Sequence, residues 1–285
     1  MALPEKVFTS LQQVIPQHLL SRLVGKLAAS HNRLIKNTFI TWFVKQYQVD
    51  LSEAKIETAN GFSTFNDFFT RELKEGRRDI SRAPNTIASP ADGAISEIGK
   101  VELGSLMQAK GQYYSLAQLL AGNAEQCNRY MDGVFATIYL SPKDYHRVHM
   151  PLDGTLKNMT YVPGDLFSVN QATANHIPGL FARNERLICE FSSPQGDFIM
   201  ILVGAMIVAG IETVWAGDVA PVKPVLKTTD FSNLKSIELK KGEEMGRFKL
   251  GSTVILLFQE KTAAFSSTLE NGSALRMGED IGSIA

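Results

Sequence analysis

Short apolar runs separated by turn residues fill most of the sequence after about residue 88, and they constrain its fold more than any other feature. The turns between them are rich in Gly, Pro and Asp. Such runs predict β-strands, and they comprise residues 94–98, 134–140, 187–191, 198–211, 236–239 and 253–258. No helical pattern alternates regularly with these runs, so a parallel βαβ arrangement is not predicted. We therefore expect an α+β fold whose β-rich domain is mostly antiparallel.

The first 75 residues or so carry a different pattern, in which apolar residues recur at helical spacing. The pattern extends from Val7 to Leu27 with a break near Pro16, and it resumes from Leu34 to Tyr47. On periodicity alone, such amphipathic helices simply pack on the rest of the protein. The alternative is attachment to a lipid surface, for which the interspersed Lys and Arg residues are suited. We expect a helical region at residues 1–75 and a β-rich domain at residues 76–285.

Composition argues against several classes of protein. The 285 residues include 29 Lys and Arg and 29 Asp and Glu, whereas a nucleic-acid-binding protein normally has a basic excess. Cys127 and Cys189 lie far apart and have no zinc-ligand spacing, so we expect two reduced cysteines and no metal. The apolar run at residues 198–211 is too short to span a bilayer, and no secretory signal is recognised. Any membrane contact is therefore expected to be peripheral.

Two of the five histidines, His146 and His149, lie within one short segment, residues 141–151. A metal-binding pair is one interpretation, but no acidic third ligand stands at a recognisable spacing. A role as general base is the other interpretation, because histidine titrates near neutral pH.

Asp92, His149 and Ser252 form a candidate acid, base and nucleophile set. Such sets are recognised by geometry, so the sequence alone does not establish that the three side chains meet. The dipeptides themselves are not specific: Asp-Gly commonly forms a turn, and Gly-Ser also occurs at residues 104–105 and 282–283.

Five segments resemble, in order, the motifs of bacterial phosphatidylserine decarboxylases, the pyruvoyl-dependent prokaryotic type I family. The segments are residues 89–93, 139–149, 166–170, 180–186 and 250–253. The resemblance implies a proenzyme that cuts itself between residues 251 and 252, into a β chain (1–251) and an α chain (252–285). The sequence after Lys261 matches the family least clearly, and no role is assigned to it.

The resemblance also implies roles for individual residues. His149, oriented by Asp92, would activate Ser252 to attack the carbonyl group of Gly251, where the absence of a side chain favours a close approach. Ser252 would end as a pyruvoyl group, which forms a Schiff base with the substrate amine and takes up the electrons released with CO2. His146 would protonate the resulting carbanion.

The same resemblance implies a substrate and a location. The enzyme would convert phosphatidylserine to phosphatidylethanolamine and CO2, using a headgroup pocket lined by Tyr139, Leu166, Phe167, Val169 and Asn170. It would act as a peripheral protein on the cytoplasmic side of the cell membrane, with its α and β chains bound to each other. The sequence does not decide whether the chain forms a homo-oligomer. No nucleic-acid partner is expected.

Two alternatives belong to other classes. A serine hydrolase would use Asp92, His149 and Ser252 on an external ester or peptide, but the sequence around Ser252 lacks the Gly-x-Ser-x-Gly elbow. A β-rich carrier or binding module is disfavoured by the paired histidines and the serine site.

Overall fold

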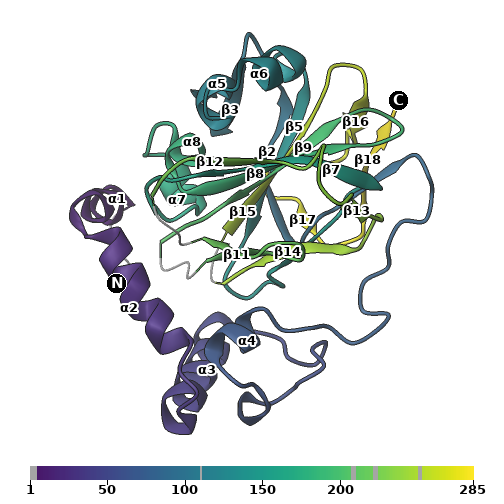
Figure 1. Cartoon of the computed structure of the whole chain (residues 1–285). Helices are drawn as coiled ribbons and strands as arrows, with labels where there is room; N and C mark the ends of the chain where they lie inside the picture. The colour runs from purple at the N-terminus through teal and green to yellow at the C-terminus, as the bar shows by residue number, and fades with distance from the viewer. Residues whose placement is uncertain (1–4, 110, 207–209, 221–223, 250–251) are drawn as a thin grey trace.

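Helices at the N-terminus precede a set of mostly antiparallel β-sheets, which confirms the predicted α+β class (Figure 1). The computed structural model describes residues 5–109, 111–206, 210–220, 224–249 and 252–285. The helices are α1 (Glu5–Val14), α2 (Gln17–Ala28), α3 (Arg33–Tyr47), the 3-10 turn η1 (Ala59–Gly61), α4 (Phe65–Phe69), α5 (Leu116–Leu119), α6 (Ala124–Tyr130), α7 (Gln171–Ala174) and α8 (Leu180–Arg183).

The largest sheet has nine strands among the described residues. Its order is β12 (Lys227–Asp230), β7 (Gly154–Val162), β8 (Arg186–Ser192), β9 (Phe198–Val203), β15 (Ser252–Phe258), β5 (Val134–Leu140), β2 (Gly93–Lys100) and β17 (Ala274–Leu275), with β13 (Glu238–Leu239) also paired to β7. A four-stranded sheet contains β11 (Gly217–Ala220), β10 (Ile211–Thr213), β14 (Glu244–Phe248) and β6 (Arg147–His149). Two smaller sheets join β1 (Thr86–Ala88), β18 (Asp280–Ile284) and β16 (Ala263–Phe265), and β3 (Ser105–Ala109) with β4 (Gln112–Ser115).

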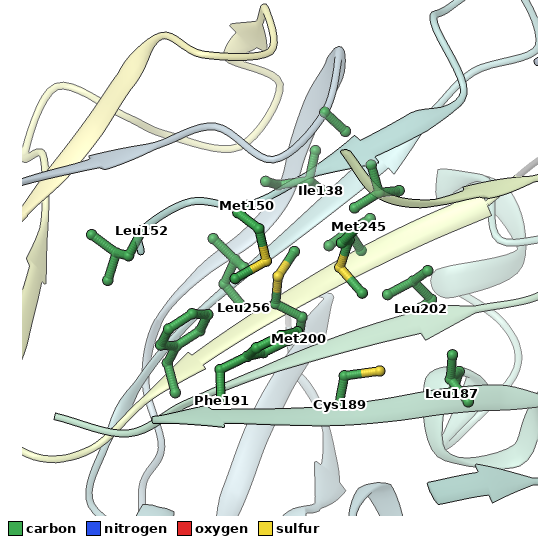
Figure 2. Close-up of a cluster of buried hydrophobic side chains, with 14 of the residues drawn as sticks. Ile138, Met150, Leu152, Leu187, Cys189, Phe191, Met200, Leu202, Met245 and Leu256 are labelled. Carbon is green, nitrogen blue, oxygen red and sulfur yellow. The ribbon is translucent and has the colours of Figure 1, made fainter. Parts of the chain in front are cut away.

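The central strand β15 separates two hydrophobic cores. Because side chains alternate along a strand, Val254 and Leu256 enter one core, and Ile255 and Leu257 enter the other. The first core lies between the nine-stranded and four-stranded sheets, and Figure 2 shows several of its side chains. Short helices α5–α8 and the β3–β4 hairpin contribute to the second core, on the opposite face.

The N-terminal helices follow the predicted pattern closely. α1 ends at Val14 and α2 begins at Gln17, with Pro16 at the N-cap position, where a missing N–H costs no helical hydrogen bond. Asn32 caps α3, since its side chain accepts a hydrogen bond from Leu34 N at 3.0 Å. α3 and α4 share a third, aromatic core that includes Phe43, Phe62, Phe65, Phe68 and Phe69.

One predicted strand is wrong in extent. The apolar run at residues 198–211 does not form a single strand: β9 ends at Val203, and Ile211 opens β10 in the other sheet. After Val203 the backbone of Gly204 turns to donate a hydrogen bond to Glu185 O at 2.8 Å, so it leaves the ladder with β15. Residues 207–209 of this run lie outside the described residues.

Candidate active site

Ser252 opens β15 in the middle of the nine-stranded sheet, where it pairs with Leu140 of β5. Its side chain is fully buried, and its Oγ has no hydrogen-bond partner among the described residues. Alternation along β15 places this side chain on the face of Val254, toward the four-stranded sheet. A buried hydroxyl without a partner is destabilising by about 1–3 kcal/mol, so Ser252 is a functional candidate on physical grounds. Gly251, its predicted partner in cleavage, lies outside the described residues.

The segment that carries Asp92 reaches the same end of the sheet. Asp92 directly precedes β2, in which Ala94 pairs with Tyr139, the residue beside the partner of Ser252. Gly93 permits this approach, because a Cβ there would lie 2.3 Å from the carbonyl oxygen of Tyr139.

The carboxylate of Asp92 is bound by two donors. Arg78 Nε donates to its Oδ1 at 2.8 Å, Arg78 Nη2 pairs with its Oδ2, and Met277 N donates to Oδ1 at 2.8 Å. Arg78 also pairs with Glu53, at 2.8 Å from Nη1. In the described part of the chain, Asp92 and His149 share no hydrogen bond. Asp92 thus anchors the C-terminal segment at the site.

His149 ends β6 and is held on both ring nitrogens. Nδ1 lies 2.9 Å from the carbonyl oxygen of Gly242, which only accepts, so Nδ1 carries the proton. Nε2 therefore has the lone pair, and it accepts a hydrogen bond from the Tyr145 hydroxyl at 3.1 Å. The backbone N–H of His149 donates to Pro90 O at 2.8 Å, which joins this strand to the Asp92 turn. Burial lowers the pKa of His149, which favours the neutral ring.

His146 is completely buried, and its ring is bonded on one side only. Nδ1 donates to the carbonyl oxygen of Asp144 at 2.8 Å, whereas Nε2 has no partner among the described residues. The ring centre lies 4.0 Å from that of Phe69, and Phe248 N donates to His146 O at 3.0 Å. Burial, and then the positive charge of Arg71, lower the pKa of His146 to about 3. His146 is thus a neutral imidazole with a free lone pair.

The predicted headgroup residues mostly have packing contacts in this structure. Phe167 and Val169 are buried in the second core, where Tyr139 also packs, and burial raises the pKa of Tyr139 to about 12. Asn170 caps the N-terminus of α7 through its side-chain oxygen. Tyr139, Phe167 and Val169 thus lie on the face of the sheet opposite to the one that carries the side chain of Ser252.

Two buried glutamines connect the N-terminal helices to this segment. Gln12 Oε1 accepts a hydrogen bond from Ser168 N at 2.8 Å, and Gln17 Oε1 accepts one from Leu166 N at 2.7 Å. Leu166 itself is buried, and Gln12 is 2% exposed. The polar side of α1 and α2 therefore faces the protein.

The opposite side of these helices is apolar and exposed, which inverts the usual orientation of a surface helix. We call it the exposed apolar face; its residues are Val7, Leu11, Val14, Ile15, Leu19, Leu23 and Leu27. Most of the exposed large apolar side chains of the described chain belong to the first 47 residues. In Figure 1, α1 and α2 project along one side of the β-sheets. A patch of this extent marks an interaction surface.

None of the helices among the described residues combines the length and the hydropathy that crossing a membrane requires. No group of three or more His, Cys, Asp or Glu side chains in that part of the chain is arranged to hold a metal ion.

Sequence reasoning missed several residues that shape the site: Arg71, Arg78, Tyr145 and Gly242. Tyr145 lies in the motif at residues 139–149. Its position four residues before His149 could have indicated that it contacts this histidine. Gly242 contributes only its carbonyl oxygen, which no side-chain pattern reveals.

The comparisons with known proteins agree with one another. A family model described as phosphatidylserine decarboxylase matches residues 65–283, and a second one, described as PSD, matches residues 7–48. The chain is 56% identical to the phosphatidylserine decarboxylase proenzyme of Alcanivorax borkumensis over 99% of its own length and 97% of the relative. It is 54% identical to the proenzyme of Ectopseudomonas mendocina, over 98% of each chain. It is 53% identical to that of Pseudomonas aeruginosa PAO1, over 98% of this chain and 97% of the relative.

Proposed function

The chain belongs to the phosphatidylserine decarboxylase family, and on that premise we propose that it is a proenzyme that cuts itself between Gly251 and Ser252. The products are a β chain (1–251) and an α chain (252–285) that begins with a pyruvoyl group. The mature enzyme then converts phosphatidylserine to phosphatidylethanolamine and CO2. The observation that carries this proposal is the Oγ of Ser252, a buried hydroxyl at the head of a central strand that has no hydrogen-bond partner in the described part of the chain.

His149 is the base that we assign to self-cleavage. Its neutral form, with the lone pair on Nε2, is the form that accepts a proton. In this role Nε2 exchanges the hydroxyl of Tyr145 for that of Ser252. Oγ loses its proton and bonds to the carbonyl carbon of Gly251, and the amide nitrogen departs, so an ester replaces the peptide bond. Elimination of that ester frees the β chain, and hydrolysis with loss of ammonia leaves the pyruvoyl group.

Asp92 acts on His149 through its charge in this scheme, rather than through a hydrogen bond. Its carboxylate favours the protonated form of His149, which opposes the effect of burial on the pKa of that ring. The Gly242 carbonyl oxygen, which accepts from Nδ1–H, fixes the tautomer. Asp92 is held in place by Arg78 and Met277.

The buried surroundings of Ser252 fit a pyruvoyl group, since its Oγ occupies a polar position that the protein leaves unsatisfied. The group supplies an electrophilic carbonyl that forms a Schiff base with the substrate amine and accepts the electron pair released with CO2. His146 is the residue that we assign to proton delivery, because its Nε2 has no competing partner among the described residues. The aromatic ring of Phe69 packs on that imidazole and helps to exclude water.

The fold explains how two chains stay together after the cut. The α chain contributes β15, which lies between β5 and β9 of the β chain. Its tail adds β17 to β2 and β18 to β1. The tail beyond Lys261, to which the sequence assigned no role, also provides Met277 N for Asp92. We propose that these contacts make the cleaved α and β chains a single stable unit.

The serine hydrolase alternative gains no support from the site. A serine hydrolase of this type holds its histidine by a hydrogen bond to the acid, whereas Asp92 and His149 share no hydrogen bond in the described part of the chain. A buried nucleophile at the start of a strand is suited to a reaction with its own chain.

The exposed apolar face suggests how the enzyme meets its lipid substrate. We propose that residues 1–75 are a membrane-associating region, peripheral to the bilayer, and that the exposed apolar face enters the headgroup and acyl boundary. Arg22, Lys26 and Arg33 lie near it, where anionic headgroups would attract them. Through Gln12 and Gln17 the same helices accept hydrogen bonds from the backbone of Ser168 and Leu166, which fixes the proposed membrane-associating region to the β-rich domain.

Replacing part of the exposed apolar face should weaken vesicle binding. We expect Leu11→Ser, Leu19→Ser and Leu23→Ser together to reduce co-sedimentation with phosphatidylserine vesicles at least ~10-fold, because each buried leucine contributes about 1.5–3 kcal/mol. Leu103→Ser with Leu234→Ser is the matched control, since both leucines are exposed but lie in the β-rich region. Equal loss of binding in the control, or none in the helix variant, would contradict the assignment.

The proposed function is tested most directly on the purified wild-type protein. Denaturing electrophoresis and intact mass should show two fragments, with the smaller starting at position 252 and blocked by a pyruvoyl group at its N-terminus. Decarboxylation of phosphatidylserine vesicles by the same sample completes the test. A single uncut chain of 31.4 kDa would contradict the proposal.

A further inference from the structure

Arg71 is a buried cation that forms no direct ion pair with a carboxylate of the described residues. It follows α4, and 5% of its surface is exposed. Its Nη2 donates to the carbonyl oxygens of Lys143 at 2.9 Å and Asp144 at 3.2 Å, but its Nε and Nη1 have no hydrogen-bond partner among the residues that the structure describes. No ion pair to a carboxylate is found for Arg71 within the described ranges. Arginine is almost never buried without pairing, so this side chain requires an explanation.

The other deeply buried arginines are satisfied. Arg78 pairs with Asp92 and Glu53. Arg186 has no carboxylate partner either, but its three nitrogens donate to four backbone carbonyl groups. Arg71 leaves three of the five N–H groups of a guanidinium unused. The fold therefore can saturate a buried guanidinium, and at Arg71 it does not.

Arg71 and His146 meet at one carbonyl group. One carbonyl oxygen, that of Asp144, accepts from Arg71 Nη2 and from His146 Nδ1. The carboxylate of Asp144 is directed instead to Ser141, whose N and Oγ each lie 2.7 Å from its Oδ2. His146 Nε2 also has no hydrogen-bond partner among the described residues. Two residues that share one carbonyl acceptor, a cation and an imidazole, thus each keep unused hydrogen-bonding groups, which is the arrangement expected of a site for an anionic ligand.

We propose that Arg71 binds the carboxylate of the substrate's serine headgroup and holds it beside His146. This inference rests on the proposed function, because it concerns the same site. The headgroup has two anionic groups, the carboxylate and the phosphodiester. His146 must reach the carbon that loses CO2, and the carboxylate is bonded directly to that carbon, whereas the phosphorus is three bonds away. A cation that shares a carbonyl partner with His146 is therefore placed for the carboxylate.

Binding of the carboxylate would couple loss of CO2 to protonation. The charge of Arg71 opposes protonation of His146, and a bound carboxylate offsets that charge, so His146 takes up a proton from water. The bond between the α-carbon and the carboxylate would then break, CO2 would depart without charge, and a pyruvoyl group at position 252 would supply the sink for the electron pair. Arg71 is again uncompensated, which favours transfer of the proton from Nε2 to the α-carbon. One proton is consumed in each turnover, as the overall reaction requires.

The test compares two soluble headgroups as inhibitors of the mature enzyme. Glycerophosphoserine has both anionic groups, and glycerophosphoethanolamine has the phosphodiester alone. We expect the wild type to bind glycerophosphoserine about 10- to 100-fold more tightly, the range that charge-assisted hydrogen bonds produce. Arg71→Ala should lose this preference, with KM for phosphatidylserine raised, and Arg71→Lys should restore part of it. Arg186→Lys is the matched control, and it should keep the wild-type preference.

Each outcome is decisive. Equal inhibition of the wild type by the two compounds overturns the inference without any variant, so it stays testable even if Arg71→Ala fails to fold or to cut itself. An Arg71→Ala enzyme that still prefers glycerophosphoserine overturns it as well. Equal weakening of both compounds in Arg71→Ala would assign Arg71 to the phosphodiester and also reject the carboxylate. An uncut, inactive wild type would instead refute the proposed function, before Arg71 is considered.

Discussion

Ser252→Ala should stay a single chain of full length and should have no decarboxylase activity. Alanine lacks the oxygen that attacks Gly251, so neither the ester nor the pyruvoyl group forms. The substitution removes only a buried hydroxyl that has no hydrogen-bond partner, so the fold should be retained or slightly stabilised. Denaturing electrophoresis, intact mass and a decarboxylation assay measure the effect, and thermal unfolding checks the fold.

Two of the three other Gly-Ser dipeptides in the chain, at residues 104–105 and 282–283, provide matched controls. Ser105→Ala and Ser283→Ala change the same residue type after glycine, but Ser283 is exposed in β18 and Ser105 is half-buried in β3. Both variants should cut themselves and stay active. Cleavage of Ser252→Ala at the wild-type position would show that another nucleophile does the work.

Much of the fold follows from local patterns. β15 and β5 are fully apolar or nearly so, and their predicted bounds agree with the structure within one residue. β7 was missed because Lys157 and Asn158 interrupt its apolar residues, and its pairing with β8 and β12 decides its conformation. Tertiary hydrogen bonding thus sets what the local sequence leaves ambiguous.

The orientation of the N-terminal helices shows a second limit. The spacing of Val7, Leu11 and Leu19 predicts an amphipathic face, but a period contains no information about which face is buried. Here the contacts of Gln12 and Gln17 with residues 166–170 decide it, because they turn the polar side inward. The usual expectation, that apolar residues pack on the protein, fails for a physical reason that only the partner surface reveals.

Only the side-chain part of the site could be predicted from the sequence, because backbone groups leave no pattern in it. Residue types at Asp92, His149 and Ser252 suggest an acid, a base and a nucleophile. The acceptor that fixes His149 is nevertheless the carbonyl oxygen of Gly242, which every residue possesses. Arg71 was equally hidden, since an arginine after an aromatic run is ordinarily a solvated residue.

Replacing His149 and His146 one at a time should have different effects on self-cleavage and on decarboxylation. His149→Ala should stay uncut, because Ser252 loses the base that its hydroxyl requires. His146→Ala should cut itself and yet decarboxylate ~10²- to 10⁴-fold more slowly, the usual contribution of a positioned acid or base. Denaturing electrophoresis measures self-cleavage, and CO2 release from labelled phosphatidylserine measures decarboxylation. His31→Ala, at an exposed position between α2 and α3, is the control and should do both.

The contrast depends on what each Nε2 already contacts. The Nε2 of His149 accepts a hydrogen bond from the Tyr145 hydroxyl, so the Ser252 hydroxyl can replace that donor at a defined position. The Nε2 of His146 has no partner among the described residues, so it is available to a substrate. If His146→Ala stays uncut while His149→Ala cuts normally, the two roles are reversed, and the free lone pair of His146 is the one that activates Ser252. If both variants cut normally, a different base serves, and Tyr145 becomes the next side chain to replace.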